Sequence, residues 1–177
     1  MAELVTRERA WNTARVAMDD RLGGFEGFFE AERDRLFRAL CVITGSRHDA
    51  EDLAQEAFLK VWERWDRVGR MEDPAGYLHR TAMNTFRNRY RRTLMALRRT
   101  IGFAPSQDVY EVVDDRQVVG TALASLTARQ RAALVLTEAF GYSSDDAGRM
   151  LGIKGSTVRA LNFQARSALR RSQEDAR

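Results

Sequence analysis

Only two prolines, Pro74 and Pro105, interrupt the 177 residues of this chain. Proline removes a backbone donor and kinks or ends a helix, so long stretches without it leave room for long helices. Apolar residues recur at helical spacing through almost the whole chain, and strand-like alternation is hard to find. We therefore predict an all-α fold, with enough residues for one ordinary domain or two small ones.

Residues 143–169 have the pattern of a helix-turn-helix. Ser143 is the predicted N-cap of a first helix, with Asp146 at its third position. Gly152 should end this helix, because glycine tolerates the left-handed conformation found there. Ser156 is the predicted N-cap of the second helix, which in DNA-binding proteins lies in the major groove. The alternative is a pair of helices in an ordinary bundle.

Composition divides the chain into two small helical domains joined by a flexible linker. Within the first domain, a helix is predicted from Phe25 to Thr44. A second helix, capped by Asp49, is predicted to run to Trp65, and a long basic helix follows from Ala75 to Arg99. The predicted divisions are a polar extension over 1–24, weakly ordered or one loosely docked helix, a first domain over 25–99, the linker over 100–117, and a second domain over 118–177 that contains the helix-turn-helix.

The long basic helix lies in a stretch, residues 74–107, that contains no Asp or Glu. Its aromatic, amide and guanidinium side chains form a mixture typical of proteins that bind single-stranded nucleic acid. The alternative is a solvated arginine face with Tyr77 in the core. The candidate residues are Tyr77, His79, Arg80, Asn84, Arg87, Asn88, Tyr90, Arg91 and Arg92.

Several classes of function have little support. The chain has two histidines and one cysteine, Cys41, so no intramolecular disulfide forms and we expect a buried thiol. No cluster at metal-ligand spacing and no phosphate loop or hydrolase motif occurs, so we expect no catalytic residue, metal or cofactor. The absence of an apolar leader and of a long apolar run predicts a cytoplasmic protein without membrane insertion.

Four stretches, in this order, resemble extracytoplasmic-function (ECF, group 4) sigma factors of the sigma-70 family. GSRHDAEDLAQEAF (residues 45–58) is similar to the second conserved region, and PAGYLHRTAMN (74–84) to the promoter-melting region. LTARQR (126–131) and LGIKGSTV (151–158) are similar to the fourth region. One helix-turn-helix would be a weak signal, whereas this succession is specific.

The resemblance implies a subunit of RNA polymerase that directs promoter-specific initiation without being an enzyme itself. Its expected partners are core RNA polymerase, promoter DNA (duplex at the −35 element, single-stranded at the −10 element) and, as a further candidate, an anti-sigma factor. The implied contacts with the polymerase clamp are Asp52, Gln55 and Glu56. The implied −10 contacts are Tyr77, His79, Arg80, Asn84, Arg87, Asn88, Arg91 and Arg92, and the −35 contacts are Ser156, Thr157, Arg159, Ala160, Phe163 and Arg166.

The chain departs from the family at several positions. Tyr77 stands where tryptophan is usual, Asn162 where a buried aliphatic residue is usual, and Gly148 where alanine is usual. Leu161 and Gln164 occupy positions that are commonly arginine. Two alternatives stay open. The C-terminal unit alone does not exclude a helix-turn-helix regulator that acts without polymerase, and the atypical recognition helix is compatible with a sigma-like interaction protein that has lost promoter reading. A hydrolase or transferase is the least supported alternative.

Overall fold

The structure is a computed structural model, and it describes residues 2–101 and 121–174. Every regular element in these two ranges is a helix, which confirms the predicted all-α fold. The first range contains α1 (Ala2–Thr44), α2 (Arg47–Trp62), α3 (Trp65–Val68) and α4 (Pro74–Ile101). The second contains α5 (Thr121–Ala124), α6 (Ala128–Leu134), the π-helix η2 (Val135–Ala139), α7 (Ser144–Leu151) and α8 (Gly155–Glu174).

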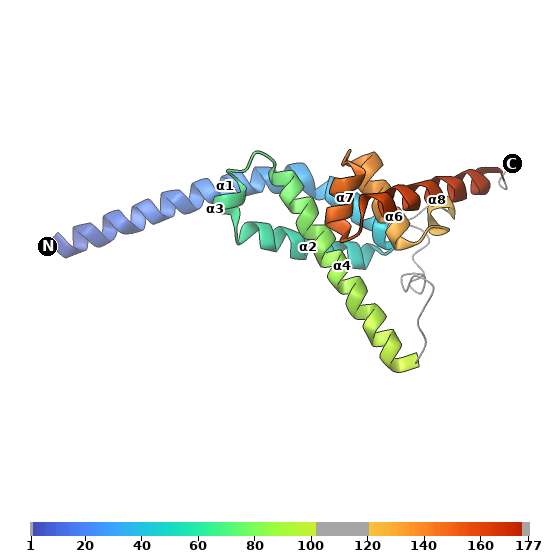
Figure 1. Ribbon diagram of the computed structural model, residues 1–177. Helices are drawn as coiled ribbons and strands as arrows, with labels where there is room; N and C mark the ends of the chain where they lie inside the picture. Colours follow the sequence, from blue (N-terminus) through green and yellow to red (C-terminus); the bar gives the residue numbers. More distant parts are fainter. Residues whose placement is uncertain (1, 102–120, 175–177) are drawn as a thin grey trace.

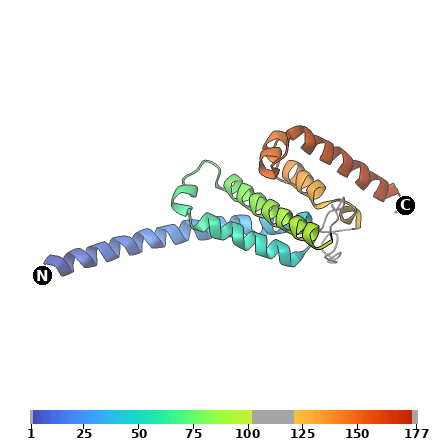
Figure 2. The ribbon, with the colours of Figure 1, turned by 60° about the horizontal axis from the view of Figure 1, so that its bottom comes forward.

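Helices α1, α2 and α4 form the first domain, with α2 packed between the other two. The N-terminal half of α1 projects as a rod (Figures 1 and 2), and the C-terminal half of α4 projects in another direction (Figure 1). The domain's core joins the apolar stripes of the three helices. Its fully buried side chains include Leu36, Leu40, Ile43, Leu53, Val61, Leu78 and Met83.

The predicted start of the first helix at Phe25 is wrong, because α1 begins at Ala2 and continues through Gly23 and Gly24. Two glycines disfavour a helix by about 1 kcal/mol each, but packing on both sides offsets that cost. Arg21 donates to the carbonyl of Trp62 at 2.7 Å, and the ring of Phe25 lies 5.0 Å from that of Trp62. These contacts hold the turns that flank the glycines.

Two predicted N-caps also differ from the structure. The side chain of Ser46, not that of Asp49, caps α2, and its Oγ accepts the Asp49 amide at 3.2 Å. Helix α8 begins at Gly155, so Ser156 lies inside its first turn. The reason is that the Lys154 carbonyl already accepts the Thr157 amide at 2.9 Å. Helix α2 therefore begins at Arg47, before the predicted cap Asp49, and α8 begins at Gly155, before the predicted cap Ser156.

The second domain contains the predicted helix-turn-helix, formed by α7 and α8. Ser143 caps α7 by accepting the Asp146 amide, and Gly152 ends it with a φ of 68°. Thr127 and Gln130 have the spacing of a capping box in the sequence, and the structure forms one at the start of α6. Local spacing predicted these features because each of them depends on residues within one helical turn.

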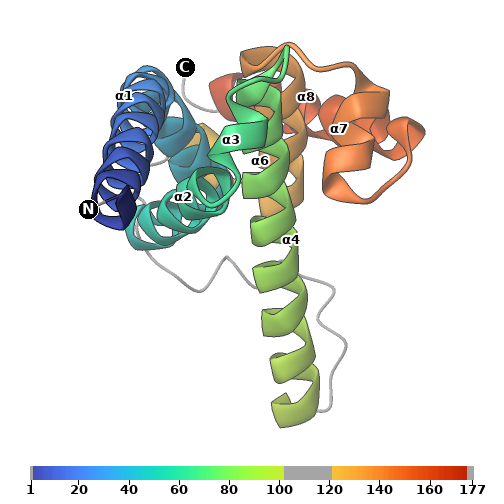
Figure 3. The ribbon, with the colours of Figure 1, turned by 90° about the vertical axis from the view of Figure 1, so that its left-hand side faces the viewer.

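The two domains pack against each other and share one continuous apolar core. Helix α1 contacts α6 and η2, and α4 contacts α7. Figure 3 shows α7 on one side of the N-terminal half of α4, while the C-terminal half of α4 extends away from the rest of the protein. The predicted linker over 100–117 lies outside the described residues, except for its first two positions, which end α4.

Candidate nucleic-acid and polymerase interfaces

One exposed stripe of α4 carries most of the predicted −10 residues. Their spacing of three or four residues places them on the same side of the helix. Arg87 is half-buried at one edge of this stripe, and Tyr77 lies at its N-terminal end. The exposed members are Arg80, Asn84, Asn88, Arg91 and Arg92.

His79 does not belong to this exposed stripe, although we predicted that it contacts the −10 element. Its side chain is buried, with 3% of the residue exposed, because it turns toward the second domain. Its Nδ1 lies 2.8 Å from the Tyr142 hydroxyl, and its ring stacks on Phe140 at 4.0 Å. Tyr90, another candidate in this helix, is also buried. Neither ring is available to DNA in this arrangement of the domains.

Burial and the positive charge of Arg35 lower the pKa of His79 to about 4, against a smaller opposite effect of Asp73. The Glu32 carboxylate lies 3.7 Å from Nε2 of His79, which is too far for a hydrogen bond. Arg35 also lies over the face of Phe140 at 4.9 Å. The imidazole is therefore held neutral between an aromatic face and a guanidinium.

Arginines join the two domains around this aromatic contact. Arg131, buried on α6, donates from Nε to the Ile43 carbonyl at the end of α1, at 3.1 Å. Arg35 donates to the Ala139 carbonyl at 3.3 Å. Arg129 lies over the ring of Tyr90 at 5.4 Å. We did not predict these contacts, because an arginine that will meet a distant carbonyl has no distinguishing local pattern.

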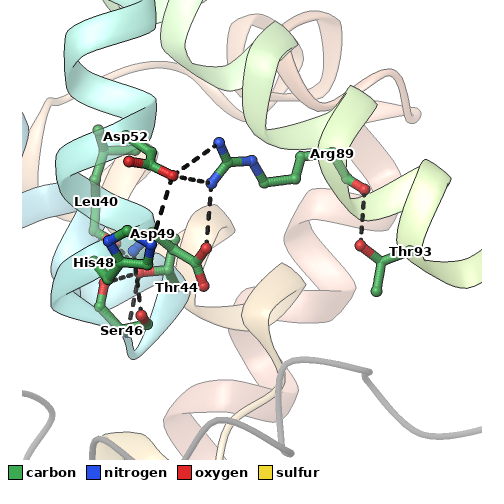
Figure 4. A network of polar contacts seen from close by, with 8 residues as sticks. All are labelled: Leu40, Thr44, Ser46, His48, Asp49, Asp52, Arg89 and Thr93. Atoms are coloured by element: carbon green, nitrogen blue, oxygen red, sulfur yellow. Dashed lines mark hydrogen bonds and ion pairs between the residues drawn. The ribbon is translucent and has the colours of Figure 1, made fainter.

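The three predicted polymerase contacts lie on α2 with different surroundings. Gln55 is exposed. Arg89 bridges Asp52 at 3.4 Å and Asp49 at 3.2 Å, as Figure 4 shows. Glu56 pairs with Lys60 at 2.6 Å. Two of the three side chains thus already have an intramolecular cation beside them, although both carboxylates remain partly exposed.

An apolar groove of about 490 Å³ lies between α1 and α2, next to Gln55. Leu59, at its edge, is 60% exposed. The other apolar lining residues are Leu22, Phe25, Phe29, Phe58 and Trp62. The surface around the predicted polymerase contacts is therefore a mixture of carboxylate, amide and apolar groups.

All six predicted −35 residues, Ser156, Thr157, Arg159, Ala160, Phe163 and Arg166, are exposed on α8. Phe163 is 69% exposed, which is unusual for so large an apolar side chain. Arg166 forms an ion pair with Glu138, and Arg159 lies 3.8 Å from Asp145. The opposite side of α8 is buried through Val158, Asn162 and Ala165. The helix thus presents its polar and aromatic side outward.

Asn162 explains one departure from the family pattern. It is buried, and its Nδ2 donates to the Thr137 hydroxyl at 3.0 Å. Thr137 lies in the π-helix η2, and its hydroxyl in turn donates to the Ala133 carbonyl at 3.0 Å. A polar pair therefore stands where an aliphatic contact would be usual.

Over the residues whose side chains are described, no group of three or more His, Cys, Asp or Glu could hold a metal ion. The same part of the chain has no helix long and apolar enough to cross a membrane. Cys41 is buried as predicted, and burial raises the pKa of its thiol against a smaller opposite effect of Arg47.

The fold and these surfaces define a two-domain helical protein with a basic aromatic helix and a helix-turn-helix. Residues 28–94 match the family Sigma-70 region 2, and residues 116–169 match Sigma-70, region 4. The ECF RNA polymerase sigma factor SigM of Mycobacterium tuberculosis is 31% identical, over 83% of this chain and 76% of its own length. The chain therefore belongs to the ECF sigma factors of the sigma-70 family.

Other relatives agree with this assignment. The ECF RNA polymerase sigma factor SigE of Mycolicibacterium smegmatis is 34% identical over 77% of this chain and 56% of its own length. The chain thus spans only about half the length of some of its relatives. A structure of the sigma factor RpoE with the anti-sigma factor NepR from Bartonella quintana has a TM-score of 0.64. The match covers 86% of this chain and 98% of the RpoE chain at 23% identity, which supports the fold.

Proposed function

We propose that this chain is a dissociable subunit of RNA polymerase that directs initiation at specific promoters and has no catalytic activity of its own. The observation that carries the proposal is the combination of the two sigma-70 regions, in order, with exposed candidate DNA contacts on both α4 and α8. Such a protein works in the cytoplasm, bound to core polymerase.

In this proposal the first domain binds the polymerase and the separated DNA strand. Asp52, Gln55 and Glu56 contact the clamp, and the exposed stripe of α4 contacts the −10 element. Arginines that follow phosphates, together with amides that read base edges, suit an unwound strand. Opening a base pair costs a few kcal/mol, which several such contacts together can offset.

The second domain reads the −35 element through α8. Arg159 and Arg166 reach phosphates or guanine edges, and Phe163 offers an apolar surface to a thymine methyl group. Their ion pairs with Asp145 and Glu138 are exposed and therefore weak, so they exchange readily for phosphate.

Run-off transcription with purified core polymerase tests the proposal. We expect the chain to give open complexes at some genomic promoters where core polymerase alone gives none. If no promoter responds, the proposal is wrong. A pull-down separates the alternative regulator, because a regulator of this class would bind specific duplex DNA and would leave polymerase unbound.

An anti-sigma factor is a further candidate partner. The supporting observation is that the structural neighbour was solved in complex with one. Two measurements test this part of the proposal. A second protein should co-purify with the chain from its own cells, and adding that protein to the run-off transcription reaction should abolish transcription.

A further inference from the structure

Two arginines converge on the hydroxyl of Tyr77 from the corner between α2 and α4. Arg64, the residue before α3, donates from Nη1 to the Tyr77 Oη at 3.0 Å. Arg67, on α3, lies over the same ring with its Cζ 5.9 Å from the ring centre. Burial by itself would raise the pKa of Tyr77, but hydrogen bonding and charge from Arg64 and Arg67 lower it. Both arginines are exposed.

The acids next to these arginines in sequence form no ion pair with them, although the charge of Glu63 acts on Arg64. Asp66 lies between the two arginines in sequence, but it pairs with Arg21 of α1 at 3.5 Å. Arg21 is held in place by the Trp62 carbonyl and by the face of the Trp62 ring at 4.6 Å. Neither Arg64 nor Arg67 has an ion-pair partner in the part of the chain that the structure describes. Two neighbouring cations therefore face solvent beside the Tyr77 phenol.

The hydroxyl group makes this arrangement suited to an anion. The Tyr77 oxygen accepts from Arg64, so its own proton is left to donate outward. Two guanidinium groups beside one hydroxyl then supply several donors, and such charge-assisted donors match a phosphate oxygen. A tryptophan at this position would have no oxygen to accept from Arg64. The arrangement thus depends on a tyrosine at position 77.

The position of the three groups indicates which phosphate they would meet. Tyr77 begins the exposed stripe that continues along α4 through Arg80, Asn84 and Asn88. Arg67 lies over the Tyr77 ring, which also packs against the core. A base would have to displace the arginine to stack there, whereas a phosphate would bind beside it.

We propose that Arg64, Arg67 and the Tyr77 hydroxyl bind one phosphodiester group of the promoter strand that enters the −10 site. This inference rests on the proposed function. It assigns a contact to two arginines outside the predicted promoter-contacting residues, and it gives Tyr77 a phosphate in place of a base.

The test measures binding of a fork-junction promoter DNA by the full chain in complex with core polymerase, as a function of salt. We expect Arg64→Gln and Arg67→Gln each to lower affinity about fivefold at 0.1 M salt, and the double variant to reduce the salt slope by about 0.7, the value for one phosphate of a single strand. Arg38→Gln, on the exposed side of α1, removes the same charge and should change neither quantity. Tyr77→Phe should lower affinity and leave the salt slope unchanged.

Neutral methylphosphonate groups, placed at one phosphate of the DNA at a time, locate the contact. At one phosphate position the neutral group should weaken DNA binding by the wild-type complex. At the same position it should weaken binding by the Arg64→Gln/Arg67→Gln variant very little, because that variant has already lost the contact. If the variant has the salt slope of the Arg38→Gln control, the inference is wrong. That result differs from failure of the proposed function, in which the wild-type chain itself would form no promoter-specific complex.

Discussion

Gly148 lies where the two helices of the helix-turn-helix come closest. A Cβ atom at this position would lie 2.8 Å from the Ile153 carbonyl oxygen and 3.0 Å from the Gly155 nitrogen. Both of these are backbone atoms, so neither can rotate away as a side chain would. The glycine therefore allows the turn between α7 and α8 to pack tightly against the first helix.

We predict that Gly148→Ala destabilises the protein, although alanine favours a helix by about 1 kcal/mol over glycine. Overpacking against backbone costs about 1–3 kcal/mol, so the net loss should be about 1 kcal/mol. Thermal unfolding followed by circular dichroism measures it. Gly27→Ala is the matched control, because nothing lies within 4 Å of its Cβ position, and it should raise stability. Equal stabilisation by both changes would contradict the clash.

Asn84 is the second residue with a specific expectation. It is exposed on α4 and has no hydrogen bond to another side chain in the described part of the chain. We expect Asn84→Ala to leave stability and polymerase binding unchanged and to weaken promoter opening, because a base loses its amide partner. Permanganate reactivity of −10 thymines measures the opening. Unchanged reactivity would remove Asn84 from the −10 site.

At the scale of elements, Arg89 connects α2 to α4. Its guanidinium bridges Asp49 and Asp52, and all three side chains are partly buried (Figure 4). The same Asp52 is a predicted polymerase contact. One arginine therefore both joins two helices and fixes the direction of a candidate binding group.

We predict that Arg89→Gln lowers the free energy of unfolding by about 1 kcal/mol, because two carboxylates then face each other without a cation. Thermal unfolding at low and high salt measures this change. The loss should shrink at high salt, where the pair is screened. Arg92→Gln, an exposed arginine on the same helix with no ion pair in the described residues, is the control. An equal effect of both variants would contradict the bridge.

At the scale of the whole molecule, the two domains cover part of each other's surface. His79, a predicted promoter contact, is buried against Phe140 and Tyr142 of the second domain. Promoter binding through His79 therefore requires the domains to separate. The equilibrium between packed and separated domains also depends on pH, because the His79 imidazole is neutral while it is buried.

The sign of this dependence follows from the pKa of His79, which is about 4 in the packed arrangement and 6.5 for a free imidazole. Packing lowers the pKa of His79, so above pH 6.5 the imidazole is neutral in both arrangements and the packed arrangement keeps its full stability. As the pH falls from 6.5 toward 4, the imidazole takes up a proton only when the domains are separated, and the packed arrangement becomes less stable relative to the separated one. Between pH 7.5 and 5 the equilibrium should shift toward separation by about thirtyfold.

Small-angle X-ray scattering at pH 7.5 and pH 5 measures this shift as an increase in the radius of gyration. Glu32, Arg35 and Asp73 face the imidazole, so their charges belong to the same equilibrium. The His79→Gln variant cannot titrate at this position and should show a smaller dependence on pH. Equal dependence in both proteins would assign the effect to other groups.

Sequence patterns predicted most local features of this fold. The caps at Ser143 and Thr127, the left-handed Gly152 and the buried Cys41 each depend on neighbours within a turn or two. The predicted start of the first helix at Phe25 was wrong because distant tryptophans stabilise the turns around the glycines. The exposed stripe of α4 followed from helical spacing, but the burial of His79 did not.

The amino-acid sequence alone determined that this chain is helical, in which order its helices come, and to which family it belongs. Helix propensity, capping and apolar spacing act between residues a few positions apart, so a linear pattern records them. The tertiary structure decided which charged groups face solvent and which face another domain. His79 meets Tyr142 across 63 positions, Arg131 meets Ile43 across 88 and Arg35 meets Ala139 across 104. Contacts over such separations form only when whole helices pack, and no local pattern encodes them.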